Sequence, residues 1–138
     1  MSLGIRMLGV GVGVAATLVS VSSAQAQNTD DLPASALTLT VAQGDSLESA
    51  SSQRSVVLVC APTVLGTHPA TGSACDELNA AGGDFEKLHG RPMRMCPMIY
   101  DPVTVAADGI WQGSPVSYRH TYPSMCAAEN RSTYVFEF

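Results

Sequence analysis

The sequence predicts an α+β domain, in which an antiparallel β-sheet carries helices on one side, and three observations support this. Residues 36–41 alternate strictly between apolar and polar side chains, as a strand with one buried face does. The dipeptide Asp108-Gly109 lies between two strand-like runs, the pattern of a β-hairpin. Residues 73–81 form the one convincing helix. Strands joined by turns, with few helices, favour an antiparallel sheet over a parallel one.

Four further patterns complete the predicted sheet. Residues 55–60 (SVVLVC) are β-branched and continuously apolar, which predicts a strand that is central in the sheet or buried on both faces. Residues 102–122 predict a strand, a turn at Asp108-Gly109 and a second strand. Gly113 and Pro115 indicate a bulge or a sheet edge within that second strand. Alternation over residues 134–138 predicts the fifth strand.

The helix over residues 73–81 has a start signal, an apolar stripe and a stop signal. Ser73 is the expected cap, with Asp76 three residues later as a weaker form of the capping box. The dipeptide Gly82-Gly83 ends the helix. Residues 84–88, and the segment that begins at Cys126, are each expected to add a helical turn. The apolar stripe consists of Ala74, Leu78 and Ala81.

Residues 1–26 have the features of a secretory signal peptide. One positive charge, Arg6, precedes an apolar run from residue 7 to about residue 21, and small residues ending in Ala24-Gln25-Ala26 follow. A membrane anchor is the alternative, but the run is too short and too rich in glycine and serine. We therefore expect cleavage after Ala26, one domain over residues 27–138, and a protein exported to the extracellular medium without a membrane partner.

Charge and cysteine content restrict the function further. The domain has twelve acidic residues against six basic ones once Arg6 is removed, which excludes nucleic acid as a partner. Four cysteines in an exported chain predict two disulfides, for which three pairings are possible. We favour the most local one, which joins Cys60 to Cys75 and Cys96 to Cys126. Zinc is disfavoured because no C-x-x-C pair is present, and we expect neither metal nor cofactor.

The side chains needed for catalysis are largely missing. The sequence has three histidines and neither a G-x-S-x-G nor an H-E-x-x-H motif. His68, between a glycine and a proline, is better interpreted as a loop histidine that ties backbone groups together than as a general base. The protein is therefore not expected to be an enzyme.

The segment from Arg94 to Pro102 (RMCPMIYDP) is the strongest candidate for a functional site. Pro97 fixes its own φ and favours an extended conformation at Cys96, and Pro102 does the same to the residue before it. An extended, pre-ordered segment with an apolar tip is what the cleft of a protease binds. The alternative is a crossing connection in which Met98 and Ile99 are simply buried.

The sequence resembles the Streptomyces subtilisin inhibitor family. Residues 60–69 (CAPTVLGTHP) and 74–78 (ACDEL) match its signature of Cys-x-Pro, Gly-x-His-Pro, and Ala-Cys with a leucine three residues after the cysteine. The likeness extends from SALTLTV through CPMIYDPV and DGIWQG to the closing VFEF. The resemblance implies a five-stranded antiparallel sheet with two helices, the two local disulfides, and a secreted homodimer joined sheet on sheet that binds one protease per subunit.

The resemblance also implies a reactive bond between Met98 and Ile99. Met98 would fill the primary specificity pocket of a subtilisin-like serine protease. Chymotrypsin-like enzymes would be inhibited more weakly, and trypsin, which wants Lys or Arg, poorly. The protease-contacting loop would consist of Met95, Cys96, Pro97, Tyr100, Asp101 and Pro102.

One departure from the family and one alternative function remain. The family's best-known member has an asparagine that braces the loop two residues before the last cysteine, and here Ser124 stands in that place of loop support. A serine reaches less far and offers fewer hydrogen bonds.

The alternative function is a secreted interaction protein or a substrate of an extracellular transglutaminase, with Gln43, Gln53 or Lys87 as the reacting residue.

Overall fold

The computed structural model describes residues 9, 11–14, 34–91 and 94–138. The predicted cleavage site after Ala26 lies outside these residues. Within the described ranges, no helix is long and apolar enough to cross a membrane.

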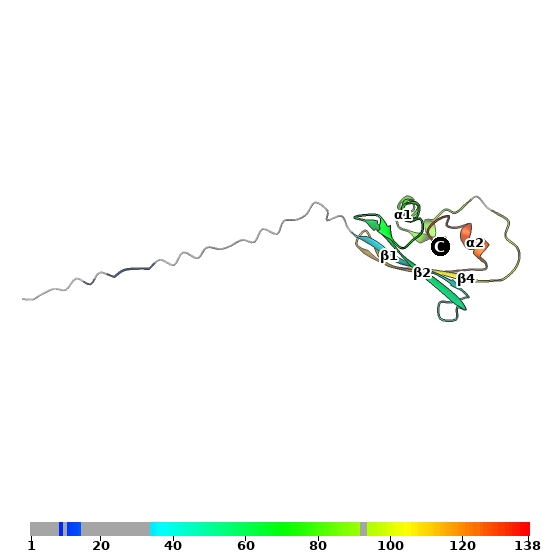
Figure 1. Cartoon of the computed structure of the whole chain (residues 1–138), viewed down its shortest axis with the longest axis horizontal. Helices are drawn as coiled ribbons and strands as arrows, with labels where there is room; N and C mark the ends of the chain where they lie inside the picture. The colour runs from blue at the N-terminus through cyan, green and yellow to red at the C-terminus, as the bar shows by residue number, and fades with distance from the viewer. Residues whose placement is uncertain (1–8, 10, 15–33, 92–93) are drawn as a thin grey trace, which may run out of the picture.

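A five-stranded sheet with helices on one side forms the domain (Figure 1). The strands are arranged in the order β3-β2-β1-β4-β5, and every neighbouring pair is antiparallel, which confirms the predicted fold class. The strands are β1 (Ser35–Gln43), β2 (Ser52–Ala61), β3 (Leu65–Gly66), β4 (Val103–Trp111) and β5 (Ser114–Tyr122). The helices are α1 (Thr71–Ala80), the 3-10 turn η1 (Phe85–Lys87) and α2 (Met125–Glu129).

The alternation predicted for β1 sets which face of the sheet is buried. Leu37 and Leu39 are buried under the helices, and Leu37 lies opposite Leu58 of β2 in the antiparallel register. Of the two alternatives predicted for residues 55–60, a place inside the sheet is confirmed, because β2 pairs with β1 and β3. Burial on both faces is wrong, because Val57 on the opposite face is 42% exposed. Since the helices cover one side of the sheet only, a continuous apolar run does not lead to two-sided burial here. The main core cluster contains Leu37, Leu39, Leu58, Ala74, Cys75, Leu78, Phe85, Leu88, Ala107, Trp111 and Val135.

The predicted turn at Asp108-Gly109 is wrong, because both residues continue β4. Gly109 lies opposite Leu37 of β1, and a Cβ at this glycine would stand 2.2 Å from the carbonyl oxygen of Ala36. The close approach of β1 therefore explains this glycine. The β4–β5 turn is Gln112-Gly113, whose φ values of 47° and 80° are both positive, as a two-residue type I′ hairpin requires.

The edge position predicted from Pro115 is confirmed, while the predicted strand over residues 134–138 is wrong. Pro115 lies in β5, at the edge of the sheet, where a missing backbone N–H is tolerated. Residues 134–138 form a turn instead of a strand. The carboxylate of Glu77 accepts hydrogen bonds from the backbone N–H groups of Thr133 (3.1 Å) and Tyr134 (2.8 Å), which binds this segment to α1. The fifth strand is β3, in a segment expected to be a loop.

Helix α1 begins earlier than predicted and lacks the predicted cap. Its N-cap residue is Ala70, which offers no side-chain hydrogen bond, so Ser73 does not cap the helix. The N–H of Ala70 instead donates to Nδ1 of His68 (2.9 Å), and Nε2 of this ring lies 3.1 Å from the carbonyl oxygen of Val135. With Nδ1 as acceptor, Nε2 carries the proton and donates. His68 is thus a buried histidine that ties backbone groups, as expected.

The predicted stop signal of α1 is confirmed. Gly82 and Gly83 both have positive φ, and the N–H of Gly83 donates to the carbonyl of Leu78 (2.8 Å), which is a Schellman motif. The helical turn expected over residues 84–88 is η1, where the Asp84 side chain accepts from the N–H of Glu86.

Candidate functional site

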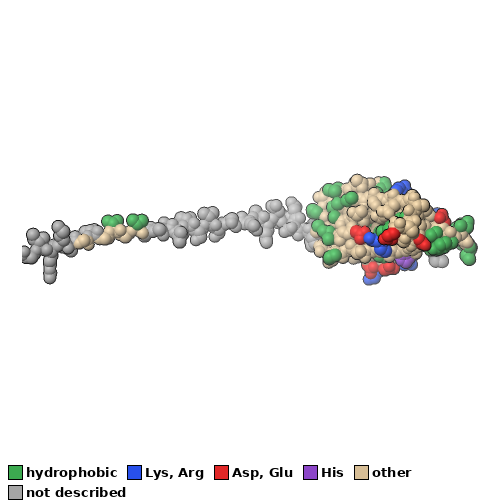
Figure 2. Space-filling model, turned by 90° about the horizontal axis from the view of Figure 1, so that it is seen from below, with side chains coloured by type: hydrophobic (Ala, Val, Ile, Leu, Met, Phe, Trp, Pro, Cys, Tyr) green, Lys and Arg blue, Asp and Glu red, His purple; other side chains and the backbone are tan. Residues whose placement is uncertain are grey.

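Residues 94–102 form an arch at the end of the molecule beyond α2 (Figure 1). We call this segment the reactive loop. Met98 and Met95 are fully exposed, at 104% and 100%, and Ile99 and Tyr100 are 68% and 71% exposed. Figure 2 shows the apolar side chains gathered at this tip. The alternative of a crossing connection with buried Met98 and Ile99 is therefore wrong.

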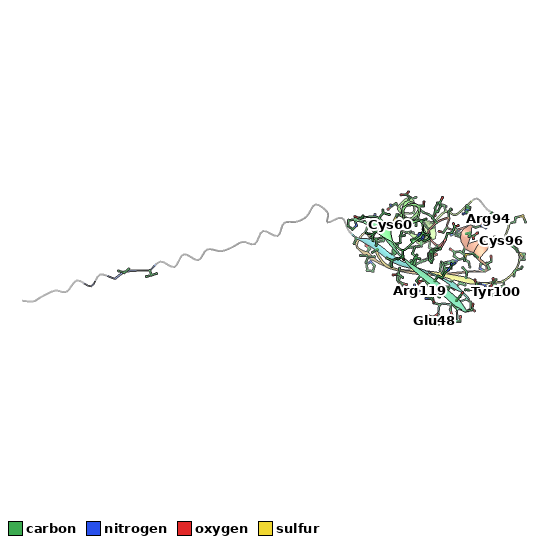
Figure 3. All side chains as sticks on the ribbon, viewed as in Figure 1. Glu48, Cys60, Arg94, Cys96, Tyr100 and Arg119 are labelled. Atoms are coloured by element: carbon green, nitrogen blue, oxygen red, sulfur yellow. A yellow bond between two sulfur atoms is a disulfide. The ribbon has the colours of Figure 1, made fainter. Side chains whose placement is uncertain are left out.

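The upstream arm of the loop is attached to α2 and to the residue after it. A disulfide joins Cys96 to Cys126, two residues before Met98. The side-chain amide of Asn130 contacts Arg94 twice: its Nδ2 donates to the Arg94 carbonyl (3.1 Å), and its Oδ1 accepts from the Arg94 N–H (3.4 Å). The Arg94 guanidinium also forms an ion pair with Glu129. Figure 3 labels Arg94 and Cys96 along this arm.

The downstream arm is attached to the start of α2 and to the end of β1. The N–H of Asp101 donates to the carbonyl of Pro123 (2.9 Å), two residues after Ile99. The amide nitrogen of Gln43 donates to the Asp101 carboxylate (2.7 Å), and the N–H of Gly44 donates to the carbonyl of Pro102 (2.8 Å). Both arms of the loop are therefore fixed, while its tip is exposed.

Ser124, which is predicted to support the loop, has its side chain engaged in α2. Its hydroxyl accepts a hydrogen bond from the N–H of Ala127 (3.2 Å), so it caps this short helix. Among the hydrogen bonds of the described residues, this hydroxyl makes none to the reactive loop. A hollow of about 370 Å³ lies beneath the tip, lined by Cys96, Pro97, Met98, Ile99, Tyr100, Pro123, Ser124 and Ala127.

The structure confirms the favoured pairing of the cysteines. Cys60 is bonded to Cys75 and Cys96 to Cys126, and among the described residues there is no free cysteine. The first disulfide joins β2 to α1, within the core cluster. The second disulfide, between Cys96 and Cys126, joins the reactive loop to α2.

The remaining candidates for chemistry are dispersed. His120 lies between the rings of Tyr118 and Tyr122, with ring centroids 6.4 Å and 4.3 Å away. Burial raises the pKa of Tyr118 and, to a lesser degree, that of Tyr122, so both rings are packed phenols at neutral pH. Within the part of the chain that the structure describes, no group of three or more His, Cys, Asp or Glu residues could hold a metal ion.

The three residues named for the transglutaminase alternative have different surroundings. The amide nitrogen of Gln43 is hydrogen-bonded to Asp101 and Pro102, Gln53 is exposed on β2, and Lys87 lies in η1 beside Asp84.

Sequence reasoning missed two residues whose side-chain amides hold the loop, Gln43 and Asn130. Asn130 is 36 residues from Arg94, and Gln43 is 58 residues from Asp101. No local spacing brings these pairs together in a sequence, since only the fold makes them neighbours. The one available signal was the tether at Cys126, which predicted that the segment around it lies against the loop.

Comparison with known proteins gives a consistent result. A profile described as subtilisin inhibitor-like matches residues 33–124. A probable subtilase-type protease inhibitor of Streptomyces avermitilis is 49% identical over 104 residues, which cover 75% of this chain and 72% of the relative. A subtilisin inhibitor of Streptomyces albogriseolus is 48% identical, and a trypsin inhibitor of Streptomyces longisporus 47%, each with the same coverage.

A solved structure supports the same relationship. The crystal structure of Streptomyces caespitosus sermetstatin in complex with Bacillus licheniformis subtilisin superposes with a TM-score of 0.68 at 40% sequence identity. The match covers 76% of this chain and 99% of that chain.

Proposed function

The chain belongs to the subtilisin inhibitor-like family, and on this premise we propose that it is a secreted inhibitor that subtilisin-like serine endopeptidases bind as if it were a substrate. Its family and relatives are protease inhibitors, not enzymes. The observation that carries the mechanism is the reactive loop, which exposes Met98 completely between two fixed arms. Secretion follows from the predicted signal peptide over residues 1–26.

In this mechanism, the loop adds to the protease cleft as an extended strand, and Met98 enters the primary specificity pocket. An unbranched thioether side chain suits the broad apolar pocket of subtilisin-like enzymes. Chymotrypsin-like enzymes are expected to bind more weakly, and trypsin poorly, because Met98 carries no positive charge. Met95 and Pro97 contact the cleft upstream and Tyr100 downstream. Cys96, Asp101 and Pro102 keep the loop in its extended shape.

The fixed arms explain why binding inhibits instead of leading to rapid cleavage. A loop that is already ordered loses little conformational entropy on binding, which favours high affinity. The protease serine can still attack the Met98 carbonyl, which forms an acyl-enzyme and frees the amine of Ile99. Because Asp101 is held by Pro123, this amine stays near the acyl group. It can then attack the ester, re-form the peptide bond and release the serine before water does.

Titration of a subtilisin with the purified secreted protein tests this proposal. We expect activity to fall linearly to zero at about one protein subunit per active site, as tight binding requires. Activity is measured with a small chromogenic peptide, and the inhibitor is followed by mass spectrometry in the same samples. Full subtilisin activity in the presence of excess oxidised protein, or prompt digestion of that protein, would contradict the proposal.

We also propose that the protein is a homodimer joined through the open face of its sheet, as the family resemblance implies. This face carries the exposed side chains of Val57 and Thr38, which are opposite one another in the β1–β2 register. No helix covers this face among the described residues. The loop after β1 reaches this face at one end, where Thr104 and Thr121 donate to the carbonyls of Gly44 and Asp45.

The variant Val57→Asp is expected to convert the dimer to a monomer. Two copies of a carboxylate would be buried in a sheet-to-sheet contact, whereas in the single subunit Val57 is 42% exposed and tolerates a charge. Sedimentation velocity of the parent protein and the variant at micromolar concentration measures the change. Inhibition of subtilisin per subunit should be unchanged. A parent protein that sediments as a monomer would remove the basis for the dimer.

A further inference from the structure

We propose that Asn130 is the positioning residue that holds the upstream arm of the reactive loop, and that the stretch from Pro123 to Asn130, which contains α2, acts as a single brace for both arms. This inference rests on the proposed function, since it concerns how the loop survives in a protease active site. Among the described residues, the side-chain amide of Asn130 is hydrogen-bonded to the reactive loop, and its backbone N–H donates to the carbonyl of Cys126 in α2.

The side-chain amide is well suited to hold a backbone segment. A primary amide offers an acceptor oxygen and a donor nitrogen side by side, so it can pair with the N–H and the C=O of one residue. Asn130 does this with Arg94, at 3.4 Å and 3.1 Å. Its nitrogen also lies 3.4 Å from Sγ of Cys96. The amide therefore contacts the backbone just before the disulfide and the disulfide itself.

Both arms of the loop end on the same short stretch of chain. Pro123 holds Asp101 through its carbonyl, Cys126 holds Cys96 through sulfur, and Asn130 holds Arg94. Cys126 lies within α2, Pro123 precedes the helix and Asn130 follows it, and Ser124 caps its start. The distance between the two arms is therefore set by a helix of fixed length.

The hollow beneath the tip gives these end contacts more weight. A hollow of about 370 Å³ is lined by Met98 and Ile99 together with Pro123, Ser124 and Ala127, so the tip is incompletely packed against the start of α2. The contacts of the two arms therefore contribute strongly to the position of the reactive bond. The Arg94–Glu129 ion pair contributes less, because both side chains are about half exposed to water, at 46% and 39%.

The consequence appears after acylation. The upstream arm then carries the acyl group on Met98, and the downstream arm carries the free amine of Ile99. If the amine attacks the ester, the peptide bond re-forms and the serine is released; if water attacks, the serine and a Met98 carboxylate are released. If the upstream arm is no longer held by Asn130, the acyl group can move away from the Ile99 amine. The rate of hydrolysis then rises relative to the rate of peptide-bond re-formation.

The test compares Asn130→Ala and Asn130→Asp with a matched control, Glu129→Gln, which removes the ion pair but keeps the amide. Each protein is incubated with a catalytic amount of subtilisin, and cleavage at Met98–Ile99 is followed by mass spectrometry. We expect cleavage to be about tenfold faster in Asn130→Ala, because this variant loses two to three hydrogen bonds to the upstream arm. Its association rate with subtilisin should stay within about twofold of the parent. Asn130→Asp keeps the acceptor but not the donor, so an intermediate rate is expected. Glu129→Gln should be cleaved at the parent rate.

A second readout needs no protease. Amide hydrogen exchange at Arg94 should accelerate in Asn130→Ala and remain near the parent rate in Asn130→Asp, because the aspartate still accepts from this N–H. Failure of the parent to inhibit subtilisin would count against the proposed function, whereas exchange at Arg94 would still test the brace. The brace is refuted if Asn130→Ala is cleaved at the parent rate, if Glu129→Gln is cleaved as fast as Asn130→Ala, or if exchange at Arg94 is unchanged.

Discussion

The variant Met98→Lys is expected to become a tight inhibitor of trypsin. The primary specificity pocket of trypsin ends in a carboxylate, which the thioether of Met98 leaves unpaired and a lysine would neutralise. A charge pair that is fully desolvated contributes several kcal/mol at an interface, so we expect trypsin affinity to rise by about a thousandfold or more. The side chain at this position is fully exposed, so the substitution should leave the fold intact.

The matched control for this prediction is Met95→Lys. Met95 is as exposed as Met98 and lies in the same loop, three residues upstream. A lysine at this position therefore adds the same charge to the loop without entering the primary pocket. Inhibition constants for trypsin and subtilisin are measured for the parent and both variants. Trypsin inhibition gained equally by the two variants would indicate a general charge effect. An unchanged profile for Met98→Lys would place the primary contact elsewhere than Met98.

The sequence was sufficient for the fold class and for the disulfides, because these depend on local patterns. Alternation in β1 marked its buried face, and the paired glycines after α1 marked its end. It was insufficient where a long-range contact decides the conformation. Asp108-Gly109 has the composition of a turn, yet β1 needs a glycine there because its backbone passes so close.

The end of the chain gives a second example. Its alternating aromatic residues predicted a strand, but the carboxylate of Glu77 satisfies the backbone N–H groups of Thr133 and Tyr134, so this segment needs no neighbouring strand. The partner of this segment is more than fifty residues away in α1, which no periodicity reveals. Alternation is therefore a weak predictor of a strand in this segment, because a side chain from another element accepts the backbone hydrogen bonds that a neighbouring strand would otherwise accept.

The reactive loop was predictable for the opposite reason. Its prolines, its cysteine and its apolar pair are all within nine consecutive residues, which predicts a constrained segment. The exposure of Met98 and Ile99 did not follow from these residues alone, because they also allowed a buried crossing connection. What holds the loop was only half predictable. Cys126 followed from counting cysteines, whereas Asn130 and Gln43 bind the arms through side-chain amides that could have been placed anywhere on the surface.

The double variant Cys96→Ser/Cys126→Ser is expected to convert the inhibitor into a substrate of subtilisin. The disulfide closes a segment of 30 residues, so its loss costs about 3.6 kcal/mol in the chain-entropy model. It also frees the upstream arm two residues before Met98, which leaves Asn130 as its remaining anchor. Religation depends on the effective concentration of the Ile99 amine at the acyl group, so we expect cleavage about a hundredfold faster. Mass spectrometry of the Met98–Ile99 bond during incubation with subtilisin measures the rate.

The double variant Cys60→Ser/Cys75→Ser separates this effect from a general loss of stability. Its disulfide closes 15 residues, which costs about 3 kcal/mol in the same model, so both double variants should melt at similarly lowered temperatures. The Cys60–Cys75 bridge joins β2 to α1 at the main core cluster, whereas the loop arms are held by α2 and the end of β1, so this variant should still inhibit when assayed well below its melting temperature. Equal cleavage of the two variants would mean that global unfolding, rather than a freed arm, exposes the reactive bond. Rapid cleavage of the Cys96–Cys126 variant alone would show that the protease is stopped by a tether acting on one peptide bond.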